Sequence, residues 1–260
     1  MPFFPLWLTA GIIILVLMTL LWLLSLYLKN SSIVDIFWGT GFFLSYWMVA
    51  WFAGESLSMR AMLLGAFVTI WGLRLSVYIF LRNHAQPEDF RYAAWRSEAG
   101  SAWWWRSFFK VFLLQGAIMW IVAAPLFVTQ AEKAAPLNLL DLVGALVWLI
   151  GFVFEAGGDW QLSRFKANST NKGKLLTSGL WSLTRHPNYF GDAAQWWGFY
   201  LISLASGGWW TIFSPIIMTF LLMKVSGVAM LERTLTKTKP GYEEYIARTN
   251  EFFPWLPKKS

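Results

Sequence analysis

Long apolar segments, separated by short polar stretches, run through most of this chain. A helix that crosses a bilayer needs about 20 mostly apolar residues. Seven segments approach that length: 5–28, 33–53, 60–82, 107–129, 138–162, 190–205 and 208–231. The pattern therefore predicts an all-α integral membrane protein, a single membrane domain over residues 1–260 with seven transmembrane helices.

Basic residues gather in alternate connections between these segments. If the N-terminus lies outside, all 21 basic residues fall in or beside cytoplasmic segments except Arg60, Arg74 and Lys133. Lys and Arg collect in cytoplasmic loops. We therefore expect the N-terminus outside and the C-terminus in the cytoplasm, and the net charge of +7 needs no nucleic-acid partner.

Composition supports the membrane prediction and limits the chemistry. The chain is 57% hydrophobic and 13% charged, and its mean hydropathy is +0.49; soluble domains carry about 25% charged residues. Without cysteine, disulfides and thiolate catalysis are excluded. With only His84 and His186 as histidines, we expect no metal site.

Charged residues inside the predicted spans are informative because a charge at a helix centre is costly. Those in or at the ends of spans are Asp35, Arg74, Glu155, Asp159, Asp192, Lys224 and Glu232. All lie in the predicted cytoplasmic half. Snorkelling explains a long Lys side chain there, whereas Asp and Glu are too short to reach far. We expect a polar cavity open to the cytosol.

Glu155 and Asp159 share one face of a helix because they are four residues apart. Gly157 and Gly158 remove side chains beside them and permit close approach of a backbone or a ligand. Such a face can bind ribose hydroxyls or an amide. The alternative is a structural ion pair with Arg164, Lys166 or Arg185.

The polar motif Thr184-Arg185-His186-Pro187-Asn188-Tyr189-Phe190-Gly191-Asp192 opens the sixth segment. Arg185 can hold a phosphate bidentately, Pro187 favours the first helical turn, and Asn188 offers donors and acceptors. Gly191 permits close packing. The motif predicts an anion site at a helix start; the alternative is an interfacial anchor on lipid headgroups. No glycine-rich nucleotide motif of a soluble fold is present.

Four motifs carry a resemblance to a known family. They are Gly179-Leu180-Trp181 with the motif at 184–192, the stretch 32–39 (SIVDIFWG), the stretch 158–162 (GDWQL), and 240–245 with 252–255 in the tail. Together they resemble the bacterial branch of the steroid 5-alpha-reductase and sterol reductase superfamily. The resemblance implies NADPH-dependent reduction of an activated carbon–carbon double bond in a lipid-soluble substrate, in the bacterial inner (cytoplasmic) membrane.

The resemblance also implies a cofactor half over residues 131–260 and a substrate half over residues 1–130. The candidate cofactor-binding residues are Glu155, Asp159, Lys166, Arg185, His186, Asn188, Tyr189, Asp192, Arg233, Tyr242 and Tyr245.

The substrate half departs from the family pattern. When Arg74 and Tyr78 are aligned with their family counterparts, Trp71 stands where the family has a proton-donating Tyr. Candidate proton donors are therefore Tyr78, Asp35 and Glu232, and candidate substrate contacts are Trp38, Trp71 and Arg74.

Two features keep alternatives open. The Arg-His-Pro-x-Tyr-x-Gly pattern also occurs in isoprenylcysteine methyltransferases, so an S-adenosylmethionine-dependent membrane methyltransferase is the main rival. A non-catalytic lipid-binding protein is the third. The polar loop 88–96 is either solvated or a lid over the cavity, and Trp103-Trp104-Trp105 indicates an interfacial aromatic belt.

Overall fold

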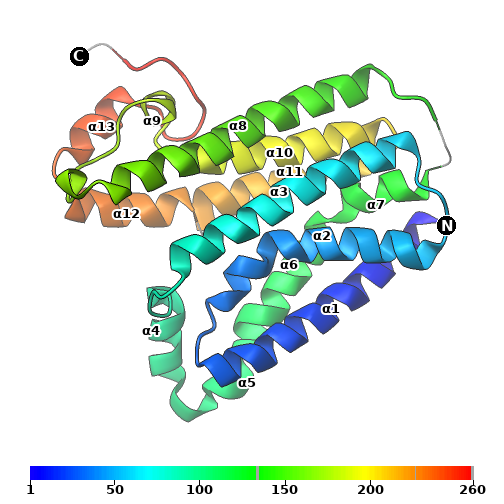
Figure 1. Cartoon of the computed structure of the whole chain (residues 1–260), viewed down its shortest axis with the longest axis horizontal. Coiled ribbons are helices and arrows are strands. Elements are labelled where there is room, and N and C mark those ends of the chain that lie inside the picture. Colours follow the sequence, from blue (N-terminus) through cyan, green and yellow to red (C-terminus); the bar gives the residue numbers. More distant parts are fainter. Residues whose placement is uncertain (133–134, 226, 259–260) are drawn as a thin grey trace. The chain divides into compact units, whose positions relative to one another are not determined.

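The computed structural model describes residues 1–132, 135–225 and 227–258, and the regular elements within them are all helices (Figure 1). This confirms the all-α prediction. The chain forms two compact units. Unit 1 comprises Met1–Leu137 with Ser206–Gly208, and unit 2 comprises Asn138–Ala205 with Trp209–Ser260.

Unit 1 contains three long helices followed by a run of shorter ones. The long helices are α1 (Phe3–Leu28), α2 (Ile33–Ala53) and α3 (Met59–Asn83). The shorter elements are α4 (Phe90–Ala99), η1 (Gly100–Ala102), α5 (Trp103–Ser107), the π-helical segment η2 (Phe108–Leu113), α6 (Leu114–Val122) and α7 (Ala124–Ala131).

Unit 2 is built on two long helices and a helical tail. The long helices are α8 (Leu139–Ala167) and α10 (Pro187–Leu204). The other elements are η3 (Ser169–Asn171), α9 (Leu180–Leu183), η4 (Trp209–Ile212), α11 (Phe213–Phe220), the π-helical η5 (Leu221–Val225), α12 (Val228–Thr238) and α13 (Tyr242–Arg248).

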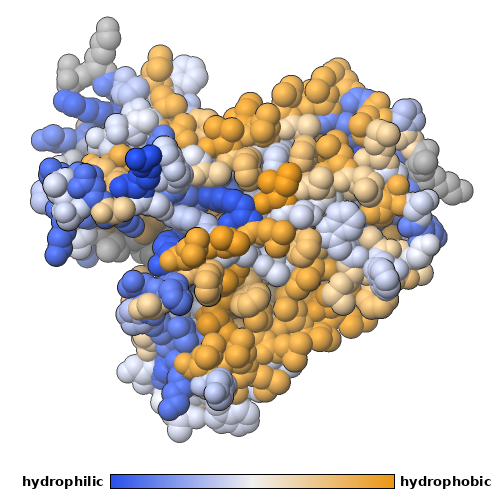
Figure 2. All heavy atoms as spheres, viewed as in Figure 1, coloured by the Kyte–Doolittle hydropathy of each residue, from blue (hydrophilic) through white to orange (hydrophobic). Residues whose placement is uncertain are grey.

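Five helices are long and apolar enough to cross a membrane: α1, α2, α3, the continuous run Phe90–Val122, and α8. Apolar side chains on these helices point outward, as in Ile12 and Leu142, which are 64% and 57% exposed. Figure 2 shows such apolar side chains over much of the visible surface. The chain is thus a multi-pass helical membrane protein. Seven spans and the direction of the termini stay predictions, because α10 and the shorter Trp209–Val225 are not among the five.

The fourth apolar helix begins earlier than the sequence pattern predicts. Residues 83–106 look polar, yet residues 90–99 form α4 and continue into the apolar run. Asp89 is the N-cap, and its Oδ1 accepts a hydrogen bond from the backbone N–H of Arg91 at 3.0 Å. The prediction of a loop over 88–96 is therefore wrong for the part beyond Asp89.

Glycines let α8 and α10 pack closely, and the two helices run side by side in Figure 1. A Cβ on Gly191 would lie 2.3 Å from the backbone N of Glu155. A Cβ on Gly198 would lie 2.8 Å from the carbonyl O of Gly144. Small residues at helix contacts in membrane proteins allow this approach. The predicted packing role of Gly191 is confirmed, and it brings the acidic face of α8 against the start of α10.

A second close contact joins α2 and α3 in unit 1. A Cβ on Gly39 would lie 2.3 Å from the carbonyl O of Gly72. The hydroxyl of the next residue, Thr40, donates a hydrogen bond to Ser76 Oγ, one turn beyond Gly72 on α3, at 2.8 Å. The Tyr46 hydroxyl donates to the carbonyl O of Ala61 at 2.6 Å. Close backbones and interhelical hydrogen bonds together hold this pair.

Candidate functional site in unit 2

The motif at 184–192 joins the start of α10 to the C-terminal tail. Pro187 is the first residue of α10, as predicted. Thr184 is buried, and its hydroxyl donates to the carbonyl O of Phe252 at 2.9 Å. The backbone N–H of Arg185 donates to the carbonyl O of Asn250 at 2.9 Å. The motif therefore fixes the tail to the cytoplasmic end predicted for this helix.

Arg185 is buried and makes its hydrogen bonds to the protein itself. Its Nε donates to Glu232 Oε1 at 2.7 Å, and its Nη1 donates to the carbonyl O of Thr249 at 2.5 Å. His186 Nε2 lies 3.2 Å from the same Glu232 oxygen, and the His186 ring stacks on Tyr189. This cluster ties α10, α12 and the end of α13 together.

The charge of Glu232 follows from these contacts. Partial burial acts to raise its pKa, but hydrogen bonds from His186 and Arg185, with the guanidinium charge, lower the pKa to about 2. Glu232 is thus a carboxylate near neutral pH. Burial, reinforced by Glu232, raises the pKa of Tyr242 to about 12. Burial also raises the pKa of Tyr245, whose hydroxyl donates to the carbonyl O of Trp181.

Two buried carboxylates on α8 face amide side chains on α10. Asn188 Nδ2 donates to Asp159 Oδ1 at 3.1 Å, and Gln195 Nε2 donates to Glu155 Oε2 at 2.5 Å. Glu155 and Asp159 are each only 3% exposed. The sequence left open what lies against these carboxylates, and the structure places amides there. Asn188 and Gln195 are seven residues apart, hence on one face of α10.

Gln195 is a site residue that sequence reasoning missed. Its side chain is fully buried, and its Oε1 accepts no hydrogen bond from any residue that the structure describes. A buried amide oxygen without a donor costs free energy, and a bound water or a ligand donor is one way to satisfy it. The sequence signal that could have identified Gln195 is its spacing of seven residues from Asn188, which places both side chains on one face of α10.

The remaining predicted residues of unit 2 are Asp192, Lys166 and Arg233. Asp192 is buried on α10, and Lys166 is exposed in the last turn of α8. The side chain of Arg233, on α12, lies outside the described residues.

An open polar groove of about 490 Å³ follows α8 beyond Asp159. It is lined by Trp160, Gln161, Arg164, Phe165, Asn168, Asn171, Leu176, Ser178 and Gly179. The Arg164 guanidinium lies over the Trp160 ring, 5.2 Å from its centroid. Gln161 Oε1 accepts from the backbone N–H of Leu180 at 3.0 Å, which fixes one wall.

In unit 1, Asp35 is held in a network that the sequence did not reveal. The Tyr92 hydroxyl donates to Asp35 Oδ1 at 2.8 Å and accepts from Gln115 Nε2 at 3.0 Å. Arg91 Nη2 donates to Asp35 Oδ2 at 3.3 Å. The stretch 32–39 thus meets the polar stretch 88–96, and Tyr92 and Gln115 join the candidate residues.

The other predicted residues of unit 1 lie on α2 and α3. The guanidinium groups of Arg74 and Arg82 lie 5.3 Å and 5.6 Å, respectively, from the centroid of the Tyr78 ring. Trp38 and Trp71 both pack against Phe42, and Trp71 is fully buried. Across the part of the chain that the structure describes, no group of three or more His, Asp or Glu residues could hold a metal ion.

Fold and site together define a multi-pass helical membrane protein with a row of buried carboxylates and amides between two tightly packed helices. Residues 21–249 match the family model described as "Protein of unknown function (DUF1295)", and the chain belongs to this family.

Similarity to curated proteins extends over the chain at low identity. The "Uncharacterized protein C594.04c" of Schizosaccharomyces pombe is 24% identical over 93% of this chain and 77% of its own length. The "Probable O-methyltransferase ustE" of Ustilaginoidea virens is 34% identical over 43% of this chain. The Delta(14)-sterol reductase of Ascobolus immersus is 33% identical over 35% of this chain.

The chain spans only 34% of that methyltransferase and 25% of that reductase. No solved structure gives a significant match. Sterol reductases and a 3-oxo-5-alpha-steroid 4-dehydrogenase are therefore distant relatives of this chain, and so is a probable O-methyltransferase.

Proposed function

We propose that this protein is an NADPH-dependent reductase of an activated carbon–carbon double bond in a lipid-soluble substrate. Its distant sterol and steroid reductase relatives support an oxidoreductase that acts on membrane lipids. Its multi-pass helical fold suits a substrate that enters from the bilayer. On the motif resemblance, we propose the bacterial inner membrane as its location.

The buried row between α8 and α10 carries this proposal. NADPH offers hydroxyl donors on its riboses and amide donors on its nicotinamide carboxamide. The carboxylates of Glu155 and Asp159 and the unsatisfied Oε1 of Gln195 are acceptors for such donors. The residues present thus fit the sugar and carboxamide parts of the cofactor.

The cationic part of the proposed site lies along the adjoining groove. Arg185 uses Nε and Nη1 on Glu232 and on the tail, so we assign it a positioning role for His186 and the tail. Arg164 lines the groove, and Lys166 lies exposed two residues further on. Guanidinium and ammonium groups bind phosphates by charge and hydrogen bonding.

Bound NADPH supplies a hydride, and the protein must then supply a proton. Glu232 is ionised near neutral pH and has no proton to give. The carboxyl oxygens of Asp35 are already engaged by hydrogen bonds from Tyr92 and Arg91. Tyr78 carries a hydroxyl proton, and the guanidinium groups of Arg74 and Arg82 lie beside its ring, where they can interact with the polar part of a substrate. We therefore favour Tyr78 as the proton donor.

An S-adenosylmethionine-dependent methyltransferase is the second candidate. The observation that favours it is the match to a probable O-methyltransferase, which covers more of this chain than the match to the Ascobolus sterol reductase does. In that case the same acceptors would bind the ribose hydroxyls and amino group of S-adenosylmethionine.

Isotope transfer separates the two reactions even when the substrate is unidentified. Purified protein is incubated with a membrane lipid extract and NADPH deuterated at the transferable position, or with trideuteromethyl S-adenosylmethionine. Mass spectrometry then follows the lipids. The proposal predicts a lipid that gains one deuterium from NADPH and one hydrogen from solvent. Transfer of a trideuteromethyl group instead would establish the methyltransferase, and no transfer from either cofactor would contradict both.

A further inference from the structure

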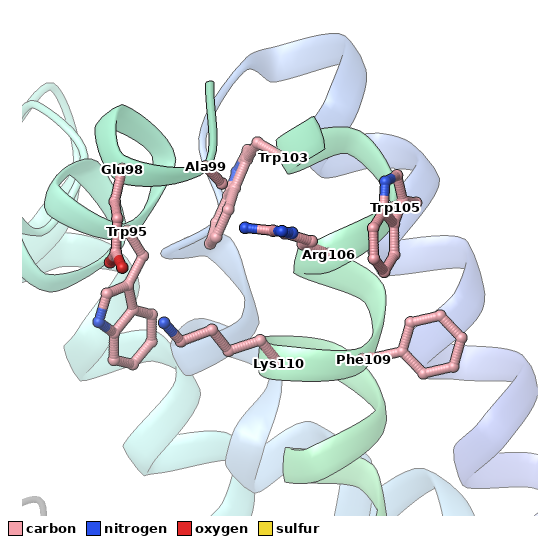
Figure 3. Close-up of a pocket in the computed structure, with 8 residues that line it drawn as sticks. All are labelled: Trp95, Glu98, Ala99, Trp103, Trp105, Arg106, Phe109 and Lys110. Carbon is pink, nitrogen blue, oxygen red and sulfur yellow. The ribbon is translucent and has the colours of Figure 1, made fainter. Parts of the chain in front are cut away.

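A second pocket lies in unit 1, where α4 meets α5 and η2 (Figure 3). Its volume is about 350 Å³, within the range of small-molecule sites. It is lined by Trp95, Glu98, Ala99, Trp103, Trp105, Arg106, Phe109 and Lys110. The proposed reductase function does not use these residues.

Two cations are held at this pocket by aromatic rings. Arg106 and Lys110 are four residues apart and project from the same side of their helix (Figure 3). The Lys110 ammonium lies 4.4 Å from the centroid of the Trp95 ring. The Arg106 guanidinium lies 5.6 Å from the centroid of the Trp105 ring. Cation–π attraction keeps both charges beside the pocket.

The walls of the pocket are fixed by contacts behind them. Trp103 is 3% exposed, and its Nε1 donates to Ser31 Oγ at 3.3 Å. The Arg96 guanidinium lies 5.6 Å from the Trp103 ring centroid. Trp95 packs edge-on against Tyr92, with ring centroids 5.7 Å apart. A preformed pocket binds its ligand at a lower entropic cost.

The charges of the lining select an anion. Arg106 and Lys110 outnumber the single acid, Glu98. The rings of Trp95 and Trp105 already carry the protein's own cations, so they do not form a cage for a cationic ligand. A phosphate that bridges the guanidinium and the ammonium satisfies both charges. Glu98 adds an acceptor for a hydroxyl group beside that phosphate.

The position along the chain suits a membrane interface. The apolar run Phe90–Val122 has 33 residues, more than the roughly 20 that a span requires. Tryptophans are enriched where a span leaves the hydrocarbon core, and three occur here at Trp103-Trp104-Trp105. Basic residues at that level bind anionic lipid headgroups.

We propose that this pocket binds the headgroup of an anionic phospholipid that carries hydroxyl groups, as phosphatidylglycerol does. The headgroup phosphate lies between Arg106 and Lys110, and Glu98 accepts a hydrogen bond from a glycerol hydroxyl. The acyl chains extend along the apolar surface of α6.

Native mass spectrometry of the detergent-purified full chain tests this proposal. Phosphatidylglycerol and phosphatidylcholine with identical acyl chains are titrated separately, and bound lipids are counted. The wild type is expected to bind phosphatidylglycerol more tightly. The double substitution Arg106→Ala/Lys110→Ala should weaken that binding by about tenfold or more, because each basic group adds about 1 kcal/mol of attraction to an anionic lipid.

Two further variants make the result decisive. Arg106→Lys/Lys110→Arg keeps both charges and should retain most of the binding. Arg248→Ala removes a comparable cation that is exposed in the last turn of α13, outside this pocket, and should leave binding unchanged. Unchanged phosphatidylglycerol binding in the alanine double variant, or equal weakening by Arg248→Ala, would overturn the proposal. So would binding of inorganic phosphate without binding of phosphatidylglycerol, which would define a site for the free anion.

Discussion

Glu232 shows how single residues set the charge of the candidate site. It receives hydrogen bonds from Arg185 and His186, and these lower its pKa to about 2. Since its pKa is 4.5 without these contacts, the ionised pair stabilises the fold fully above about pH 4.5. That contribution is lost as the pH falls from there towards 2.

Glu232→Gln should therefore destabilise the protein by about 2 kcal/mol at neutral pH, the usual contribution of a charged hydrogen bond. The difference in thermal midpoint between wild type and variant should shrink from pH 7 to pH 3. Glu243→Gln, which changes an exposed acid on α13, is the control and should behave like wild type. A difference that grows on acidification would refute the assigned charge state.

Gln195 provides the residue-scale test of the cofactor row. Gln195→Leu removes a buried acceptor and should weaken NADPH binding by about tenfold, the equivalent of one hydrogen bond. Gln130→Leu is a matched control, because Gln130 also has a buried, unsatisfied Oε1 but lies in unit 1 and donates to the carbonyl O of Tyr46. Titration calorimetry measures the affinity of both variants for NADPH. Equal affinities would show that Gln195 does not contribute to cofactor binding.

The polar motif shows what single residues in a sequence can reveal. Asp159, Asn188 and Arg185 stand out because they are polar in an apolar chain, and all are buried or half-buried in unit 2. Their partners could not be predicted in the same way. Gln195 meets Glu155 only because two helices pack at a particular rotation, which depends on the glycines between them.

At the scale of elements, the contact between α8 and α10 organises unit 2. Gly191→Ala would place a Cβ 2.3 Å from a backbone atom that cannot move without shifting α8. We expect a loss of stability of at least about 1–3 kcal/mol, the usual cost of overpacking. Loss of NADPH binding should accompany it, because the carboxylate row depends on this contact.

Gly157→Ala is the control for that substitution. The nearest atom to its added Cβ is the flexible Cδ1 end of Leu180, at 2.9 Å. Because alanine favours a helix over glycine, this variant should be tolerated or mildly stabilised. Thermal unfolding in detergent compares Gly191→Ala with Gly157→Ala. Equal destabilisation of both variants would show that the close packing at Gly191 does not cause the loss of stability.

Element boundaries were predictable where hydrophobicity ends sharply. α2 occupies the predicted segment 33–53. α1 begins two residues before its predicted segment and ends at the predicted residue, and α3 extends one residue beyond its segment at each end. α4 was missed because its residues are polar and its first turn depends on Asp89 capping, followed by the contacts of Tyr92 with Asp35 and Gln115. Those contacts join residues far apart in the chain.

At the scale of the whole molecule, the membrane topology is open to direct measurement. The chain has no cysteine, so a single introduced thiol reports its own side of the membrane. With the N-terminus outside, Ser56→Cys should react with an impermeant maleimide in intact cells. Ser178→Cys should react only after permeabilisation. The opposite pattern would reverse the orientation, and labelling of both in intact cells would change the number of spans between them.

The central claim concerns the cofactor, and equilibrium binding to the purified protein tests it most directly. NADPH and S-adenosylmethionine are titrated separately into wild type and Asp159→Ala. The account predicts saturable, one-to-one binding of NADPH that Asp159→Ala weakens, and no comparable binding of S-adenosylmethionine. Tight binding of S-adenosylmethionine without NADPH binding, or NADPH binding that Asp159→Ala leaves unchanged, would contradict it.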